Sequence, residues 1–158
     1  MLFGLTPTHN PRLQLLKNVV LFKDLSMRDL AMVDSLMHER HYLAEEVIFD
    51  EGEEGQGLFV VLSGRVKITL PAGVNAALIE LGPGAFFGEV ALLDQSLRTA
   101  QARAIDDTRI AALFRADFYS LLKTHSAIAS HISFQLAKVL AARLRHAVGN
   151  TSRRHEAA

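Results

Sequence analysis

The segment FGEVALLDQSLRTA, residues 87–100, interrupts a series of short strands and decides how the rest of the chain is interpreted. Its first part, Glu89 to Leu93, has the character of a short helix and is followed by a loop and another strand. The N-terminus of a helix presents unpaired backbone N–H groups that attract phosphate, and the guanidinium of Arg98 can hold two phosphate oxygens at once. Glu89 can accept a hydrogen bond from a sugar hydroxyl. The segment predicts a nucleotide pocket, and a surface loop with a Glu89–Arg98 ion pair is the alternative.

Short strands separated by turn residues fill the zone from about 43 to 115 around this segment. The candidates are Val47–Phe49, Leu58–Leu62, Arg65–Leu70, Ala76–Leu81, Thr99–Ile105 and Arg109–Phe114. Glycines in the turns supply backbone conformations that other residues avoid. Strands this short and this regularly punctuated indicate a sandwich or a barrel.

Helical spacing occurs on both sides of the strand zone. We expect helices between about Pro11 and Tyr42, with Ser26 as the N-cap of one of them. After the strands, we expect a short helix over Asp117–Lys123 and a longer one over about Ser126–Val148. The polar end of the chain, 149–158, is predicted to be a flexible tail.

Composition excludes several classes of function. The chain has 158 residues, enough for one domain with a core, and its 17 basic residues balance its 17 acidic residues. Zero net charge provides no general attraction to nucleic acid or to anionic membranes. The absence of cysteine excludes disulfides and thiolate metal sites. No apolar run approaches the ~20 residues that a membrane span requires, so we expect a cytoplasmic protein with no membrane contact.

Residues 87–100 resemble the phosphate-binding cassette of the cyclic-nucleotide-binding domain family, which includes the catabolite activator protein, protein kinase A regulatory subunits and cyclic-nucleotide-gated channels. The family pattern is F-G-E-x-A-L followed, after a few variable residues, by R-[S/T/A]-A, and the chain matches both parts. The resemblance extends over about 21–145. It includes a helical entry, with Leu21-Phe22 and Leu25-Ser26, and the turn glycines Gly52, Gly55, Gly64 and Gly84.

The resemblance implies an α+β fold: an eight-stranded antiparallel jelly-roll β-barrel, flanked by N-terminal helices and a C-terminal helical lid. It divides the chain into an N-terminal extension at 1–20, a cyclic-nucleotide-binding domain at 21–148 and the tail at 149–158. Within the domain, the barrel is expected over about 43–115 and the C-terminal helices over 117–148.

The implied ligand is cyclic AMP or cyclic GMP, and no metal is implied. By resemblance, Glu89 receives the ribose 2′-hydroxyl, Arg98 neutralises the cyclic phosphate, and Thr99 contacts the phosphate or the base. Threonine at this position is compatible with cyclic GMP, whereas cyclic AMP is the commoner ligand. Backbone groups of Gly88, Ala91 and Leu92 complete the cradle. The predicted ligand-binding residues are Phe87, Gly88, Glu89, Val90, Ala91, Leu92, Arg98, Thr99 and Ala100.

Two positions depart from the family pattern. Leu97 stands where the family often has proline, and Gln56 stands where an acidic residue is frequent. Neither change removes a polar contact that the pocket needs, although Leu97 leaves the loop less rigid.

The expected role is that of a sensor or regulatory module rather than an enzyme, because no acid–base pair or nucleophile is indicated. Its C-terminal helix would cover the base, with candidate contacts between Phe134 and Arg145, and would signal to an effector protein or to another copy. The apolar stripe of this helix fits either a homodimer or packing on its own barrel. DNA binding is not expected, because about ten residues after this helix leave no room for a helix-turn-helix. The alternative function is a barrel that binds no nucleotide and serves for dimerisation or interaction.

Other patterns favour ordinary structural roles. Gly82-Pro83-Gly84 lacks the remaining residues of a phosphate loop and is interpreted as a turn. His38 and His41 are expected on a helix surface without a third metal ligand. We expect all seven histidines to lie outside the strands, which disfavours a metal-binding jelly roll. The acidic residues at 45–54 and the basic residues from Arg143 onward are interpreted as solvated surface.

Overall fold

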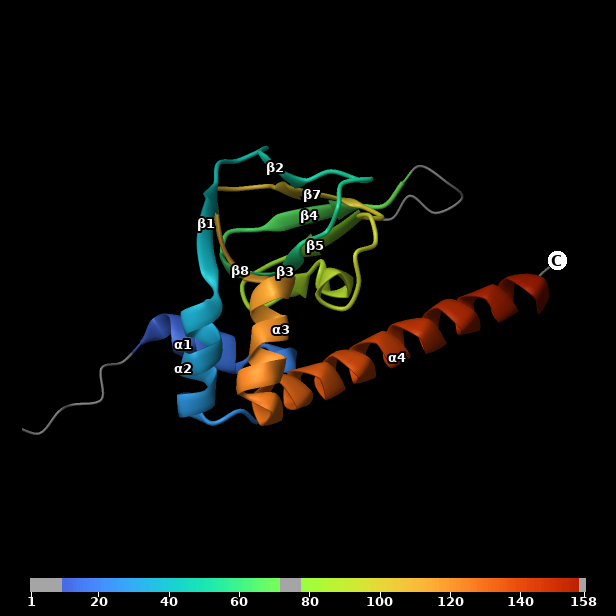
Figure 1. Ribbon diagram of the computed structural model, residues 1–158. Coiled ribbons are helices and arrows are strands. Elements are labelled where there is room, and N and C mark those ends of the chain that lie inside the picture. Colours follow the sequence, from blue (N-terminus) through green and yellow to red (C-terminus); the bar gives the residue numbers. More distant parts are fainter. Residues whose placement is uncertain (1–9, 72–77, 157–158) are drawn as a thin grey trace, which may run out of the picture.

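The computed structural model describes residues 10–71 and 78–156, and its strands form two four-stranded antiparallel sheets (Figure 1). One sheet has the order β1-β8-β3-β6, with β1 at His38–Tyr42, β8 at Thr108–Phe114, β3 at Gly57–Ser63 and β6 at Phe86–Phe87. The other has the order β2-β7-β4-β5, with β2 at Val47–Phe49, β7 at Gln101–Ala104, β4 at Val66–Thr69 and β5 at Leu78–Leu81. The predicted fold, an eight-stranded antiparallel jelly-roll flanked by N-terminal and C-terminal helices, is confirmed, and its strands are divided between these two sheets.

Strand β3 is hydrophobic on both faces because it lies between two layers of core. Phe59 and Val61 point into the space between the sheets, whereas Leu58 and Val60 point to the other side and pack against helices. Successive side chains of a strand face opposite ways, so a strand covered on both sides needs a continuous apolar run. The run GLFVVL, residues 57–62, meets this need and fixes the sheet between the barrel interior and the helical layer.

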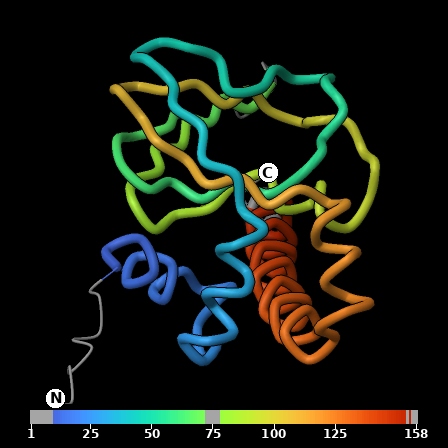
Figure 2. The backbone as a smooth tube through the Cα atoms, turned by 60° about the vertical axis from the view of Figure 1, so that its left-hand side comes forward, coloured from blue at the N-terminus to red at the C-terminus, as the bar shows by residue number. Residues whose placement is uncertain are grey.

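Apart from the short 3₁₀ helix η2 (Glu89–Leu92), which follows β6, the helices lie at one end of the barrel, as Figures 1 and 2 both show. They are α1 (Pro11–Lys17), the 3₁₀ helix η1 (Val20–Phe22), α2 (Met27–Leu36), α3 (Arg115–Thr124) and α4 (Ser126–Glu156). The predicted N-cap is confirmed, since the Ser26 hydroxyl accepts a hydrogen bond from the Asp29 N–H at 3.1 Å. Ser26 caps α2, and Leu30 and Val33 of α2 are fully buried.

Helix α4 is far longer than the other helices and projects away from the barrel (Figure 1). Its 31 residues correspond to about 46 Å. Ile132 and Leu136 are fully buried against the body of the protein, whereas residues 141–153 are exposed. The prediction ended this helix at Val148, but the structure continues it to Glu156. None of the described helices combines the length and the apolar character that would cross a membrane.

The N-terminal region also contributes to the core. Leu16 and Val19 are fully buried in the cluster that joins the helices to β3. These residues lie in the segment that the sequence assigned to an extension, so the helical layer begins earlier than residue 21. In the same way, the predicted strand over Ala76–Leu81 is found at Leu78–Leu81, and its first two residues lie outside the described part.

The prediction for residues 38–42 is wrong: the sequence analysis placed them in a helical zone, but the structure shows them as strand β1. His38 and His41 lie on this edge strand, so the expectation that every histidine lies outside the strands is wrong. The sequence HERHY has no alternation of apolar and polar residues, since both faces of β1 are largely exposed. Its conformation comes from pairing with β8, which places His38 opposite Ala112 and Tyr42 opposite Thr108.

The two histidines do not form a metal site. Residues three apart on a strand face opposite sides of the sheet. His38 contacts Asp117 of α3, and His41 contacts Asp107 beside β8. Across residues 10–71 and 78–156, no three His, Cys, Asp or Glu side chains come together in a way that could hold a metal ion.

Candidate functional site

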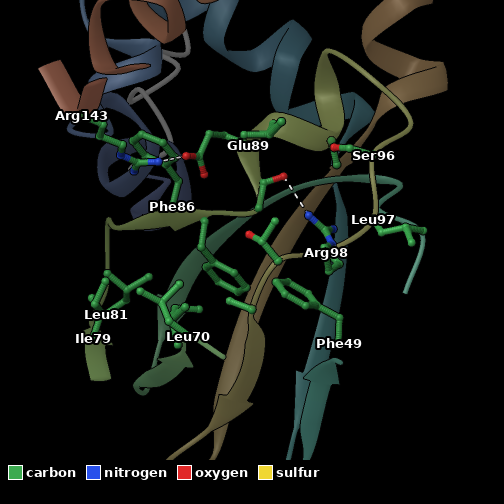
Figure 3. A pocket seen from close by; sticks show the side chains of 17 residues that line it. Phe49, Leu70, Ile79, Leu81, Phe86, Glu89, Ser96, Leu97, Arg98 and Arg143 are labelled. Carbon is green, nitrogen blue, oxygen red and sulfur yellow. Dashed lines mark hydrogen bonds and ion pairs between the residues drawn. The ribbon is translucent and has the colours of Figure 1, made fainter. Parts of the chain in front are cut away.

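A cavity of about 390 Å³ opens beside the segment 87–100, and its volume is in the usual range for small-ligand sites (Figure 3). Of the nine residues predicted to bind ligand, all except Leu92 line it. Leu92 is instead fully buried in the helical core, where it anchors the short helix η2 (Glu89–Leu92). The predicted short helix after Phe87 is therefore present, and it positions the side chains that follow.

Gly88 makes the sharp turn between β6 and η2. Its φ of 71° is left-handed, which glycine adopts without steric cost. A Cβ atom at this position would lie 2.6 Å from Nη1 of Arg98, so the glycine also leaves room for the guanidinium. The absence of a side chain at Gly88 is thus what allows Arg98 to reach the backbone here.

Arg98 is held in place by backbone carbonyls and by an aromatic ring. Nη1 donates to the Gly88 carbonyl and Nη2 to the Gly57 carbonyl, each at 3.0 Å. Its Cζ lies 4.2 Å from the ring centroid of Phe49, a distance at which a cation and an aromatic face attract each other. Burial lowers the pKa of Arg98, and the nearby Glu53 opposes this change. Arginine remains charged at neutral pH, so the cavity holds a fixed cation.

Glu89 is almost completely buried, with 5% of its surface exposed. Its partner is Arg143 of α4, whose Nη1 forms an ion pair with Oε1 (Figure 3). The pair explains how a carboxylate remains in a buried position, since an unpaired buried charge is costly. The alternative of a surface loop with a Glu89–Arg98 pair is wrong, because the two side chains have different partners and both line the cavity.

Arg143 is a charged residue of the site that sequence reasoning did not single out. It was interpreted as part of a solvated basic end, although it lies inside the 134–145 range considered for lid contacts. A signal was available, because Arg143 follows Leu136, Val139 and Leu140 at helical spacing on the buried side of α4. Burial lowers the pKa of Arg143, and its Cζ lies 5.9 Å from the ring centroid of Phe86.

The remaining wall of the cavity is apolar. Leu70, Ile79 and Leu81 line it on the side of β4 and β5, and Phe86 lies below Arg143 (Figure 3). The cavity therefore has a cationic end at Arg98, an acid at Glu89 and a hydrophobic surface beyond. Such a sequence of surfaces suits a ligand with an anionic group, a hydroxyl and a flat apolar ring.

Comparison with known proteins identifies the family to which the chain belongs. Residues 39–125 match the family model of the cyclic nucleotide-binding domain. The Cyclic AMP receptor protein of Thermus thermophilus is 38% identical over 134 residues, which make up 84% of this chain and 60% of that protein. The chain thus spans about 60% of the length of this curated relative.

Solved structures with the same fold include regulators of two kinds. The Thermus thermophilus Catabolite Activator Protein superimposes with a TM-score of 0.75 at 34% identity, over 84% of this chain and 62% of that chain. The regulatory domain of Toxoplasma gondii PKA, crystallised with cAMP, gives a TM-score of 0.63 at 28% identity, over 70% of this chain and 42% of that chain. On the strength of the family match and the shared fold, the chain belongs to the cyclic nucleotide-binding domain family.

Proposed function

We propose that this protein binds cyclic AMP or cyclic GMP in the cavity beside residues 87–100 and acts as a regulatory sensor rather than an enzyme. The observation that carries the proposal is the convergence of Arg98 and Glu89 on one cavity, each fixed by contacts of its own. A cyclic nucleotide carries an anionic phosphodiester and a free ribose 2′-hydroxyl, which are the groups that these two side chains suit.

Each part of the ligand has a counterpart in the cavity. Arg98 neutralises the cyclic phosphate, since its remaining N–H groups can donate after two have gone to carbonyls. Glu89 accepts from the 2′-hydroxyl, and Thr99 contacts the phosphate or the base. Backbone groups of Gly88 and Ala91 complete the cradle, and the apolar wall of β4 and β5 covers the base.

The Glu89–Arg143 ion pair supports a route for the signal. It joins the proposed ribose contact directly to α4, the helix that projects from the barrel (Figure 3). A ligand that alters the surroundings of Glu89 changes the strength of this pair, and therefore the preferred position of α4. A ligand shifts such an equilibrium only by as much as its affinity for the two positions differs. An effector protein or a second copy of the chain would detect the change.

A second copy is favoured by the outer face of α4. Apolar side chains on this face alternate in steps of three and four residues, which is the spacing of a coiled-coil seam. They are Phe134, Ala137, Ala141, Leu144 and Val148, and all of them are exposed. Since this face points away from the barrel, the stripe is available for a homodimer, and we propose that two chains associate along it.

The test of ligand binding is calorimetric titration of the purified protein with each cyclic nucleotide. Arg98→Ala is expected to weaken binding by roughly 30-fold to several thousand-fold, corresponding to about 2–5 kcal/mol for the loss of a buried charge partner. Arg103→Ala is a matched control, because Arg103 also donates to a backbone carbonyl, that of Glu45, but does not line the cavity.

Circular dichroism and thermal unfolding of each variant establish that the fold is retained. A wild-type protein that binds neither nucleotide would refute the proposal and would favour the barrel as an interaction module. Equal affinities in wild type and Arg98→Ala would refute the assignment of the phosphate site.

A further inference from the structure

Three phenylalanine rings pack together between the two sheets, next to the guanidinium of Arg98. They are Phe49 of β2, Phe59 of β3 and Phe87 of β6, and their ring centroids lie 5.4–5.9 Å apart. No more than 8% of any of them is exposed. Cζ of Arg98 lies 4.2 Å from the ring centroid of Phe49 and 5.4 Å from that of Phe59. The face of an aromatic ring carries partial negative charge, so both rings attract the guanidinium.

Phe49 reaches this position because β2 is irregular. The pairing of β2 with β7 shifts register between Val47 and Phe49, as it does at a β-bulge. In a regular strand, Ile48 and Phe49 would face opposite sides of the sheet, yet both pack against the core between the sheets. A bulge redirects a side chain, and bulges are frequent beside functional sites. The irregularity therefore allows the ring of Phe49 to line the cavity beside Arg98 (Figure 3).

The groups that hold Arg98 within the protein are electrically neutral. They are the carbonyls of Gly57 and Gly88 and the aromatic rings. Among the side chains that the structure describes, no carboxylate forms an ion pair with Arg98. A carboxylate would neutralise the guanidinium and would compete with an anionic ligand for its N–H groups. A ring instead contacts the flat face of the guanidinium, so it takes no N–H group and leaves the positive charge in place.

We infer that Phe49 is a positioning residue for the proposed anion site, because its ring holds the guanidinium of Arg98 at the cavity and leaves the charge of Arg98 to the ligand. The inference rests on the proposed function and adds the residue that prepares the arginine for the phosphate. Without the ring, the side chain of Arg98 gains conformational freedom and occupies the binding orientation for a smaller fraction of the time. The affinity for the ligand falls in proportion to that fraction.

Graded fluorination of Phe49 tests the role of its ring. Fluorine atoms withdraw electrons from the ring and weaken its attraction for a cation, whereas the size and the apolar character of the side chain change little. Phenylalanine analogues with one, two and three fluorine atoms are incorporated at position 49, and calorimetry measures the affinity for cyclic AMP and cyclic GMP. The affinity is expected to fall with each added fluorine, to a total loss of roughly 2- to 30-fold, the range for a lost cation–ring contact.

The same analogues at Phe118 are the matched control. Phe118 is 2% exposed and lies in the helical core, and no cation lies over its ring among the residues that the structure describes. Fluorination there should leave the affinity unchanged. Phe49→Leu keeps an apolar side chain but removes the aromatic face, so it should weaken binding at least as much as three fluorine atoms do.

A second measurement shows whether the effect passes through Arg98. In the wild-type background, each fluorine at position 49 should lower the midpoint of chemical denaturation, because the ring then holds the buried guanidinium less strongly. In Arg98→Ala the ring has no guanidinium to attract, so this trend should disappear. The comparison is a double-mutant cycle, and it needs no ligand.

If the protein binds nucleotide through Arg98 but the affinity does not depend on fluorination at position 49, this inference alone is overturned. A trend of the same size at Phe118, or one that persists in Arg98→Ala, would assign the effect to packing and would also overturn it. If the wild type binds neither nucleotide, the proposed function fails and this inference fails with it.

Discussion

At the scale of single residues, Glu89 has to satisfy two requirements at once. It is buried, so its charge needs a partner within the protein, and Arg143 supplies that partner at Oε1. A carboxylate has a second oxygen with lone pairs of its own, so Oε2 can accept from a ribose hydroxyl without displacing Arg143. Ligand and helix can therefore bind the same carboxylate together.

Glu89→Gln tests whether Glu89 accepts a hydrogen bond from the ribose 2′-hydroxyl while it is paired with Arg143. The amide oxygen can still accept one hydrogen bond, but a neutral acceptor is weaker than a charged one by about 1 kcal/mol. Binding of the ribonucleotide should weaken by roughly fivefold to tenfold. The 2′-deoxy analogue, which lacks the hydroxyl, should lose less, so competition binding should show reduced discrimination between the two sugars. A variant that distinguishes them as well as the wild type does would show that Glu89 does not contact the ribose.

The extent to which the site could be predicted depends on how far apart its residues are in the sequence. Glu89 and Arg98 lie in one short segment whose spacing is informative, and the structure places both in one cavity. Arg143 is distant from that segment in the chain, and an arginine near the end of a helix is usually solvated. Only the packing of α4 against the barrel brings it to Glu89.

At the scale of elements, the junction between β6 and η2 shapes the site. Gly88 has a left-handed backbone and contacts Arg98. A side chain at this position would therefore strain the backbone and would also collide with the guanidinium of Arg98. The left-handed conformation alone costs a non-glycine residue about 1–2 kcal/mol. Displacement of Arg98 by the added Cβ would further reduce affinity for an anion.

Gly88→Ala should accordingly lower the free energy of unfolding by about 1–2 kcal/mol and weaken nucleotide binding in the same protein. Chemical denaturation and calorimetry measure the two effects separately. Gly82→Ala is the matched control, because a Cβ at Gly82 meets nothing within 4 Å. Wild-type affinity in Gly88→Ala would show that the turn does not position Arg98.

Elements with an internal pattern were predictable, and elements made by pairing were not. The N-cap at Ser26 and the apolar run of β3 are local signals, and the structure confirms both. Strand β1 is polar and exposed, so its extended conformation depends on its pairing with β8. Strand β6 has only two residues, and the second of them, Phe87, is the first residue of the segment taken to be an interruption of the strands. Helix α4 continues past Gly149 because one glycine lowers helix stability without ending the helix.

At the scale of the whole molecule, α4 has two faces with different partners. One face packs Ile132 and Leu136 into the core and directs Arg143 into the cavity. The other carries the exposed stripe, on which Leu144 is 66% and Phe134 62% exposed. Both faces belong to one helix, so the proposed function predicts that a ligand-induced shift at Arg143 would also move the stripe. Ligand binding and association of two chains would then be coupled.

Leu144→Glu tests association through this stripe. In a symmetric dimer, the substitution removes one leucine from each of the two chains and introduces a negative charge on each side of the interface. Burying a leucine contributes about 1.5–3 kcal/mol, so the dissociation constant should rise by at least about 100-fold. Sedimentation equilibrium with saturating cyclic nucleotide should show a dimer for the wild type and a monomer for the variant.

Ala142→Glu is the control for this experiment, because Ala142 is exposed on the same helix but lies off the stripe. It should leave the dimer intact. The Leu144→Glu chain should bind nucleotide with the affinity of the wild-type monomer, measured at protein concentrations too low for association, since Leu144 does not line the cavity. A wild type that remains monomeric at micromolar concentrations with ligand bound would exclude the dimer, and α4 would then have to signal to a different protein.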